Sequence, residues 1–292
     1  MKYFLYWGCS LEGTGANFLI SLRPVAKTFG IEFEEIEDWN CCGASVSYVG
    51  ARDLAIKVLN ARNLALAESK GSYDIVAPCS SCYIQMLKVN HEIQEDEGLR
   101  TRVNECLAEG GLNYKGTIRV RHIMDVLYND VGVEKIKSKV VKPLNGLKIA
   151  GYVGCQSVRP YGEYDSVEKP KIQDLLLKAL GAEPVPFPKK MRCCGSGIFM
   201  SEMELCVRLV GDILEDATNH GAEMVSTVCP MCAMNLEIYQ DRVNKALGTE
   251  FDVPVVYLTQ LMAAAFGMDL KKEAALDYNI IPPEGILKAA IG

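Results

Sequence analysis

Ten of the twelve cysteines repeat one pattern twice along the chain. In each copy a single cysteine comes first, a Cys-Cys-Gly tripeptide follows, and a Cys-x-x-Cys pair ends the pattern. The ten are Cys9, Cys41, Cys42, Cys79 and Cys82 in the first copy, and Cys155, Cys193, Cys194, Cys229 and Cys232 in the second. Cysteine thiolates are the usual ligands of zinc and of iron–sulfur clusters. The spacing therefore predicts two metal-binding sites, one in each half of the chain.

Three interpretations of these thiols compete. Buried structural cysteines are common, and we expect this role for Cys106 and Cys206, which lie outside the pattern. Zinc binds Cys-x-x-Cys pairs, but a Cys₄ zinc site would leave one thiol over in each half. A polynuclear cluster needs ligands from several directions, which thiolates on separate loops provide, although a four-iron cubane uses only four. The spacing favours iron–sulfur redox sites, with zinc as the alternative.

Length and composition indicate a globular protein of two similar halves. The 292 residues have a net charge of −6, which argues against general nucleic-acid binding. No apolar run approaches the roughly 18 residues of a membrane helix, and the N-terminus is too short for a signal peptide. We therefore expect a cytoplasmic protein, in which thiols stay reduced and spaced cysteines bind metal more often than they form disulfides.

Short apolar segments alternate with helical patterns and place the cysteines just after predicted strands. Expected strands are Lys2–Tyr6, Ile31–Ile36, Tyr73–Ala77 and Thr117–Arg121, then Leu147–Val153, Glu183–Phe187, Ala222–Val228 and Val253–Tyr257. Expected helices are Ala16–Phe29, Asp53–Lys70, one opened by Cys79, and His122–Asn129, then about Lys171–Leu180, Glu202–Asn219, one opened by Cys229, and Leu258–Phe266. An acidic insertion from Glu92 to Gly116, a lysine-rich linker at Val131–Asn145 and an extended tail at Pro282-Pro283 complete the prediction.

This order predicts an α/β fold with parallel sheets, made of two similar Rossmann-like halves that arose by domain duplication. We place the first domain at residues 1–145 and the second at 146–292. Ligands of such sheets bind outside the carboxyl ends of the strands. Cys9, Cys79, Cys155 and Cys229 all fall there, so the thiols of each half are expected to converge.

The repeated pattern resembles the cysteine-rich CCG domain, and a chain of two such domains resembles the B subunit of methanogen heterodisulfide reductases. The gap of 34 residues before Cys229 lies slightly outside the usual range of that motif. The resemblance implies two [4Fe-4S] clusters of the noncubane type, each ligated by all five cysteines of its half. It also implies a substrate, the mixed disulfide of coenzyme M and coenzyme B, which is reduced to two thiols.

A duplicated site suits that reaction. Splitting a disulfide takes two electrons, whereas an iron–sulfur cluster passes one at a time. Two clusters facing each other across a pseudo-twofold axis could supply two one-electron steps. The chain lacks ferredoxin, dinucleotide-binding and Walker A motifs, so we expect partners to deliver the electrons. The resemblance implies the iron–sulfur C subunit and the flavin-containing A subunit of heterodisulfide reductase, with a hydrogenase beyond them.

Two other functions stay open. One is an iron–sulfur electron-transfer component of a related oxidoreductase that acts on lactate, glycolate or succinate. The other is a zinc-binding scaffold protein without catalytic activity. If the chain is catalytic, the basic residues Lys189, Lys190 and Arg192 beside the second Cys-Cys-Gly, and Arg159 after Cys155, are candidates to bind anionic groups of the substrate. A solvated basic loop is an equally good interpretation of the first three.

Overall fold

A computed structural model describes all 292 residues and contains two four-stranded parallel sheets. The strand order is β2-β1-β3-β4 in the first sheet and β6-β5-β7-β8 in the second, so both halves repeat one topology. The strands are β1 Lys2–Leu5, β2 Glu32–Glu35, β3 Ile75–Ala77, β4 Val120–His122, β5 Lys148–Gly151, β6 Glu183–Pro184, β7 Met224–Thr227 and β8 Val255–Tyr257. The predicted α/β class with parallel sheets is confirmed.

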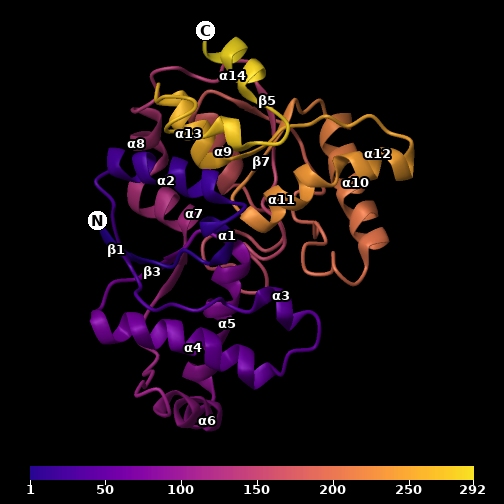
Figure 1. Cartoon of the computed structure of the whole chain (residues 1–292). Helices are drawn as coiled ribbons and strands as arrows, with labels where there is room; N and C mark the ends of the chain where they lie inside the picture. Colours follow the sequence, from indigo (N-terminus) through magenta and orange to yellow (C-terminus); the bar gives the residue numbers. More distant parts are fainter.

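Helices cover the sheets and account for most of the remaining chain (Figure 1). In the first half they are α1 Cys9–Glu12, α2 Ala16–Thr28, α3 Ala44–Ser47, α4 Asp53–Lys70, α5 Ser80–Glu95, α6 Glu97–Ala108, α7 Ile123–Asp125, the π-helix η1 Val126–Val131 and α8 Val133–Lys137. In the second half they are α9 Ile172–Ala179, α10 Met203–Asn219, α11 Pro230–Ile238, α12 Gln240–Leu247, α13 Leu258–Ala265, the 3₁₀-helix η2 Leu276–Tyr278 and α14 Glu284–Ile291. No helix is long and apolar enough to cross a membrane.

The central strands are apolar because helices bury both faces of each sheet. Ile75, Val76 and Ala77 make up the whole of β3 and are fully buried, as are Phe4 and Leu5 of β1. Two elements differ in detail from the prediction. The predicted helix after β4 is a short α7 that continues as η1, and the predicted linker at 131–145 contains α8.

Two segments that were predicted to be irregular are helical. The insertion predicted between Glu92 and Gly116 contains the end of α5 and all of α6, because the Asp96 carboxylate accepts the Leu99 N–H at 2.9 Å and caps α6. The predicted extended tail is wrong. Residues 284–291 form α14, which follows Pro283 and buries Leu287.

The two halves pack against each other through paired contacts. Helix α2 lies beside α13 (Figure 1), where Ser21 Oγ and Thr259 Oγ1 are 2.7 Å apart. The Phe18 ring stacks on the Tyr257 ring, with centroids 4.5 Å apart. One continuous hydrophobic core contains residues of both sheets. The halves therefore form a single packed body rather than two loosely linked domains.

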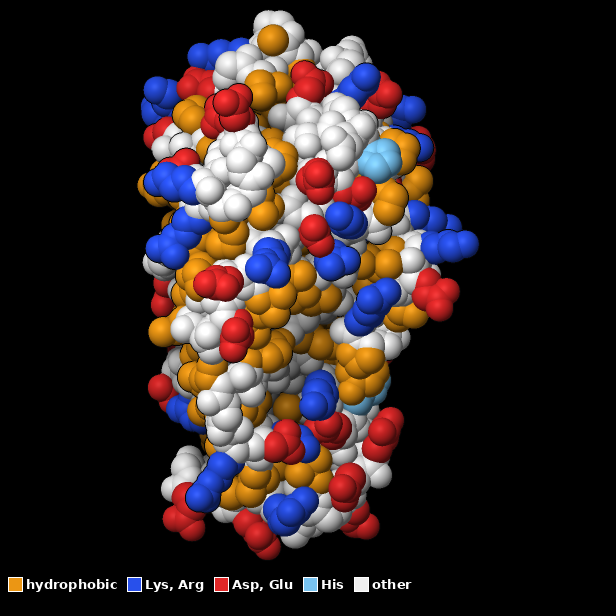
Figure 2. Space-filling view, turned by 90° about the vertical axis from the view of Figure 1, so that its right-hand side faces the viewer, with side chains coloured by type: hydrophobic (Ala, Val, Ile, Leu, Met, Phe, Trp, Pro, Cys, Tyr) orange, Lys and Arg blue, Asp and Glu red, His pale blue; other side chains and the backbone are white.

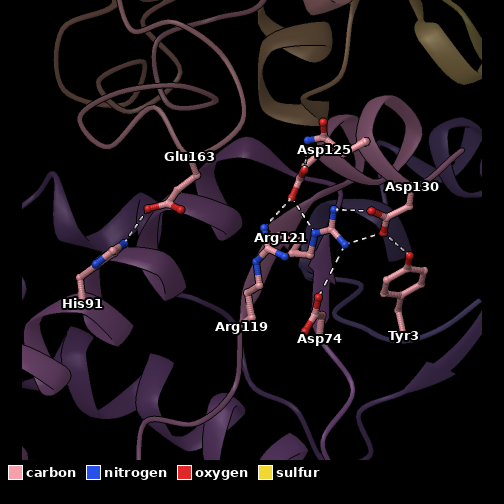
Figure 3. Close-up of polar contacts among 9 residues, drawn as sticks. Tyr3, Asp74, His91, Arg119, Arg121, Asp125, Asp130 and Glu163 are labelled. Atoms are coloured by element: carbon pink, nitrogen blue, oxygen red, sulfur yellow. Dashed lines mark hydrogen bonds and ion pairs between the residues drawn. The ribbon is translucent and has the colours of Figure 1, made fainter. Parts of the chain in front are cut away.

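A buried arginine ties the edge of the first sheet to its neighbours (Figure 3). Arg121 of β4 donates from Nε to Asp125 at 2.6 Å and from Nη1 to Asp130 at 2.5 Å. Asp74 lies 3.6 Å from the same Nη1. The Tyr3 hydroxyl donates to Asp130. These contacts join β1, β4, α7 and η1.

Candidate metal centre

Four pattern cysteines lie just beyond the carboxyl ends of strands. Cys9 follows β1 and begins α1, and Cys155 follows β5. Cys79 and Cys229 are the N-caps of α5 and α11, which follow β3 and β7. Because parallel strands end at the same edge of a sheet, these loops meet there. As the sequence predicts, this arrangement brings the single cysteine of each half beside the Cys-x-x-Cys pair of that half.

The Cys-Cys-Gly loops need their glycines. Gly43 has φ +75° and Gly195 has φ +83°, which L side chains rarely adopt. A Cβ on Gly43 would lie 2.9 Å from Ile56 Cδ1, and one on Gly195 would lie 3.1 Å from the Cα of Cys206. The Gly195 N–H also donates to Cys193 Sγ at 3.3 Å. Each glycine thus allows its loop to form a tight turn. In the second loop, the Gly195 N–H also points toward a thiol.

An asparagine amide holds the backbone carbonyl of the second tandem cysteine in each half. Asn60 Nδ2 of α4 donates to the Cys42 carbonyl oxygen at 2.8 Å, and Asn235 Nδ2 of α11 donates to that of Cys194 at 2.7 Å. Both asparagines are fully buried. They stand at different places in the two repeats, so the repeated cysteine pattern gave no signal for them.

All ten pattern thiols line two adjoining cavities. The first cavity, of about 20 Å³, is lined by Cys9, Cys41, Cys42, Cys79 and Cys82. The second, of about 210 Å³, is lined by Cys155, Cys193, Cys194, Cys229 and Cys232. Tyr48, Ser81, Ser196 and Gly197 line both. Each cavity thus has the five thiols of one half and shares a wall that both halves build.

Sulfur atoms approach one another closely within each half. Sγ–Sγ distances are 3.6 Å for Cys9 and Cys41, and 3.5 Å for Cys42 and Cys82. Cys194 and Cys232 are also 3.5 Å apart. Such crowding separates the acidities of the thiols, because one thiolate can accept hydrogen bonds from its neighbours.

The first cysteine of each tandem pair has a lowered pKa, and so does Cys229, which accepts hydrogen bonds from the Cys232 and Cys79 thiols. A hydrogen bond from the Cys155 thiol, helped by the Gly195 N–H, lowers the pKa of Cys193 to about 6. The thiols of Cys42 and Cys9 likewise hold the pKa of Cys41 far below its usual range. The donating partners Cys9 and Cys155 have raised pKa values for the same reason. Thiolate is the form that binds metal.

The donor set suits a polynuclear iron–sulfur cluster. It consists of five thiols from three loops, and no imidazole or carboxylate lines either cavity. No three His, Cys, Asp or Glu side chains are arranged as a site for a single ion. Cys106 is exposed on α6, not a core residue as expected, whereas Cys206 is buried beside Cys194 and accepts from Asn235 Nδ2 at 3.1 Å.

None of the basic side chains singled out in the sequence lines the two cysteine cavities. Lys190 pairs with Asp174. Arg192 and Lys189 lie 3.1 Å and 3.9 Å from Asp212. Arg159 belongs to a separate cleft next to the second cavity. Lys189, Lys190 and Arg192 thus have acidic partners within the second half.

Tyr48 and Gln156 are site residues that the sequence did not reveal. Gln156 Nε2 donates to the Tyr48 hydroxyl oxygen, and Gln156 Oε1 accepts from Ser81 Oγ at 2.6 Å. A Cβ at Gly197 would lie 2.7 Å from Tyr48 Cδ2, so this glycine makes room for the ring. Burial raises the pKa of Tyr48 to about 12. The phenol is therefore protonated at neutral pH.

A buried hydrogen-bond chain crosses between the halves behind the thiols. His122 Nδ1 accepts the Met124 N–H at 3.2 Å, so the neutral ring carries its proton on Nε2, 3.2 Å from Ser80 Oγ. Ser80 Oγ is 2.7 Å from Ser157 Oγ, which donates to the Val153 carbonyl oxygen at 2.7 Å. The chain fixes the N-terminus of α5 against the loop that carries Cys155.

Comparison with known proteins gives consistent matches. The cysteine-rich domain CCG matches residues 3–87 and 149–237, more than half of the chain. The chain is 36% identical over 282 residues to the 8-methylmenaquinol:fumarate reductase membrane anchor subunit of Wolinella succinogenes, covering 96% of this chain and 97% of the relative. It is 33% identical over 299 residues to a protein of Archaeoglobus profundus described as similar to the B subunit of heterodisulfide reductase, covering 99% and 97%.

Two further matches extend this result. The B subunit of a ferredoxin/F(420)H(2)-dependent CoB-CoM heterodisulfide reductase of Methanosarcina acetivorans is 30% identical over 284 residues, with 96% of this chain and 94% of the relative covered. A solved structure of a hypothetical protein from Helicobacter pylori superposes with a TM-score of 0.76 at 14% identity. The match covers 96% of this chain and 52% of that one, and at this identity it shows the fold alone.

Proposed function

The chain belongs to the cysteine-rich CCG domain family, and on that basis we propose that it is an iron–sulfur oxidoreductase component that reduces a mixed disulfide to two thiols. One observation carries the proposal. The five thiols of each half line one cavity, and the two cavities share the wall made by Tyr48, Ser81, Ser196 and Gly197. A disulfide held at that wall would have one sulfur beside each set of thiols.

Each half would hold one [4Fe-4S] cluster of the noncubane type on its five cysteines. When bound, each such cluster would supply one-electron transfer. Two clusters together would supply the two electrons that reduction of a disulfide takes. The reaction also consumes two protons, one for each product thiol. The Tyr48 hydroxyl lies at the shared wall and keeps its proton at neutral pH, so it can donate a hydrogen bond to a departing thiolate while solvent supplies the protons.

The halves are proposed to be two copies of one Rossmann-like unit, residues 1–145 and 146–292, related by a pseudo-twofold axis. Reciprocal contacts support this relation. Phe18 stacks on Tyr257 at the end of β8, and Tyr164 stacks on His122 at the end of β4 with centroids 5.5 Å apart. Ser10, next to Cys9, contacts Met231 of the second Cys-x-x-Cys, and Gln156, next to Cys155, contacts Ser81 of the first.

The relatives named for the B subunit of heterodisulfide reductase point to the substrate and partners. We propose the mixed disulfide of coenzyme M and coenzyme B as substrate. Electrons would come through the iron–sulfur C subunit and the flavin-containing A subunit of such a reductase, with a hydrogenase beyond them. The chain would thus be the catalytic component of a larger assembly.

A second candidate is favoured by the relative from Wolinella succinogenes, which is named as a subunit of a fumarate reductase. In that case the two cysteine sites would carry electrons within a fumarate- or succinate-type oxidoreductase. The shared wall between the cavities would then have no disulfide to bind.

Iron and acid-labile sulfide content, measured on anaerobically purified protein, tests the cofactor. About eight irons per chain are expected for two four-iron sites. Reduction of the heterodisulfide by reduced viologen, with both thiols quantified, tests the reaction. An EPR signal that changes on adding coenzyme M thiol to oxidised protein would support direct binding of substrate sulfur. Iron without disulfide turnover or response to thiol would favour the second candidate, and zinc without iron would overturn both.

A further inference from the structure

A third cleft lies next to the cysteine cavities. Its volume is about 420 Å³, and it shares Tyr48 and Gln156 with the second cavity and Tyr48 with the first. The bonded pair of Tyr48 and Gln156 therefore forms a wall between this cleft and the thiols. The cleft and the second cavity thus meet at these two side chains.

Two cations from different halves line this cleft. Lys88 comes from α5, and Arg159 comes from the loop that follows Cys155. Arg159 donates from Nε to the Val167 carbonyl oxygen at 2.9 Å and forms no ion pair. The one acidic side chain in the cleft is Asp53, and it is bound to Lys57 at 2.6 Å.

The charge of Lys88 is also poorly neutralised. Its nearest carboxylate is Glu92, whose Oε1 is 3.7 Å away, and the other oxygen of Glu92 contacts Lys57 at 3.2 Å. The cleft therefore has an excess of positive charge. By contrast, Lys189, Lys190 and Arg192 are each matched to an aspartate. Among the four basic residues that the sequence singled out, Arg159 is the one without an acidic partner.

Apolar groups complete the cleft. Ile56, Ile84, Pro160 and Ala51 line it together with the two cations. Such a surface fits a short aliphatic chain that ends in an anionic group, because the methylenes bury against carbon and the anion meets lysine and arginine. A neutral molecule of the same length would give Arg159 no anionic partner.

We propose that this cleft is the binding subsite for the anionic end of the substrate, with Lys88 and Arg159 as the anion-binding residues. The ligand class is an organic thiol or disulfide with an aliphatic arm that carries a sulfonate, carboxylate or phosphate. The proposal rests on the proposed disulfide chemistry for its purpose, but the binding of the anion needs no turnover and can be measured separately.

Butane-1-sulfonate is the binding probe, because it has the arm and the anion but no sulfur that can react. Its affinity for the full chain, measured by ligand-observed NMR, should fall about tenfold in Arg159→Gln and in Lys88→Gln, and binding should be lost in the double variant. Arg159→Lys keeps the charge and should restore most of the affinity. The exposed residues Arg102 and Lys178 provide the controls Arg102→Gln and Lys178→Gln, which should bind like the wild type.

Equal affinity in all variants, equal affinity for butan-1-ol, or no binding to the wild type would overturn the subsite. A turnover comparison separates this outcome from failure of the proposed function. The kcat/KM for dithiobis(ethanesulfonate) relative to bis(2-hydroxyethyl) disulfide should fall about tenfold in Arg159→Gln. If neither disulfide is reduced but the affinity for butane-1-sulfonate falls in the Arg159 and Lys88 variants as expected, the subsite stands without the disulfide reaction. If both are reduced with an unchanged ratio, the subsite is wrong.

Discussion

Tyr48 is the one side chain that lines both cysteine cavities and the neighbouring cleft. Its ring packs over Gly197, and its hydroxyl is held by Gln156, which is itself bonded to Ser81. The residue thus joins a loop of the first half to loops of the second. Its raised pKa of about 12 keeps a proton on the oxygen across the range in which enzymes work.

We expect Tyr48→Phe to reduce heterodisulfide turnover about 100-fold, because the variant removes the hydrogen-bond donor to the departing thiolate but keeps the ring. Iron content should be unchanged. The measurement is steady-state reduction of the disulfide with reduced viologen, and Tyr278→Phe at an exposed tyrosine is the control. Full activity in Tyr48→Phe would mean that the departing thiolates need no hydrogen bond from this hydroxyl.

His122 makes stability depend on pH. Burial lowers its pKa to about 4, against 6.5 for an ordinary histidine. Between these values the unfolded chain binds a proton that the folded chain does not, so the free energy of unfolding falls as the pH drops from 6.5 to 4 and is unaffected by this group above 6.5. The expected loss is about 3 kcal/mol at pH 4 and about 2 kcal/mol at pH 5.

Urea unfolding followed by circular dichroism at pH 7.5 and pH 5 measures this effect. His122→Gln should lose most of the difference between the two pH values, whereas His91→Gln should keep it, because His91 is partly exposed beside Glu163 (Figure 3). Acid lability of bound clusters affects all three proteins alike. An equal pH dependence in wild type and His122→Gln would contradict the assignment.

Among single residues, the sequence revealed some members of the site and hid others. Repetition identified the ten cysteines, and the structure gathers them by half. The pattern did not repeat for three other site residues. Tyr48 lies in a loop, Gln156 follows a cysteine, and Lys88 lies on a helix surface. Nothing in their residue types or spacing indicates a site. They become site residues only because the second half packs against the first.

Among the elements, β4 carries a buried arginine that binds several carboxylates. Arg121 is 5% exposed and binds Asp125 and Asp130, while Arg119 two residues earlier is 61% exposed and lies 3.8 Å from Asp125 (Figure 3). Removing a buried partner leaves the opposite charges without compensation, which costs far more than loss of an exposed pair.

Arg121→Ala should therefore lower the free energy of unfolding by about 3–5 kcal/mol, whereas Arg119→Ala should change it by less than about 1 kcal/mol. Chemical unfolding of the two variants provides the comparison. Backbone amides of β4 and η1, the elements that Arg121 joins, should exchange hydrogen faster in Arg121→Ala than in Arg119→Ala. Similar losses in both variants would show that the buried pairs do not hold this edge of the sheet.

Strands and long helices were predictable because their patterns are local. Helix α4 begins and ends at the predicted residues Asp53 and Lys70. Helix α6 was missed although Leu99, Val103 and Leu107 follow helical spacing, because the acidic residues before them and the glycines on either side resemble a loop. Helix α14 was missed because Pro282-Pro283 suggested a tail, whereas a proline before the first turn is compatible with a helix start.

The whole molecule contains the cysteine-rich domain twice, and residues of both copies line the wall between the cavities. Strand order, cysteine pattern and cross-half contacts all repeat. The exterior gives no comparable signal, since acidic and basic side chains alternate with apolar ones over the face in Figure 2. Duplication and fold class could be predicted from the sequence, but the shared wall could not, because it depends on how the halves pack.

The most direct test replaces one cysteine in each half in turn. Cys42→Ser and Cys194→Ser lie at equivalent places in the two Cys-Cys-Gly loops. Iron content and heterodisulfide turnover should be measured on both variants and on the wild type, all purified without oxygen. We predict that each variant loses about half of the iron and essentially all of the turnover, because each cavity serves one sulfur of the disulfide. Full turnover in either variant would contradict this mechanism.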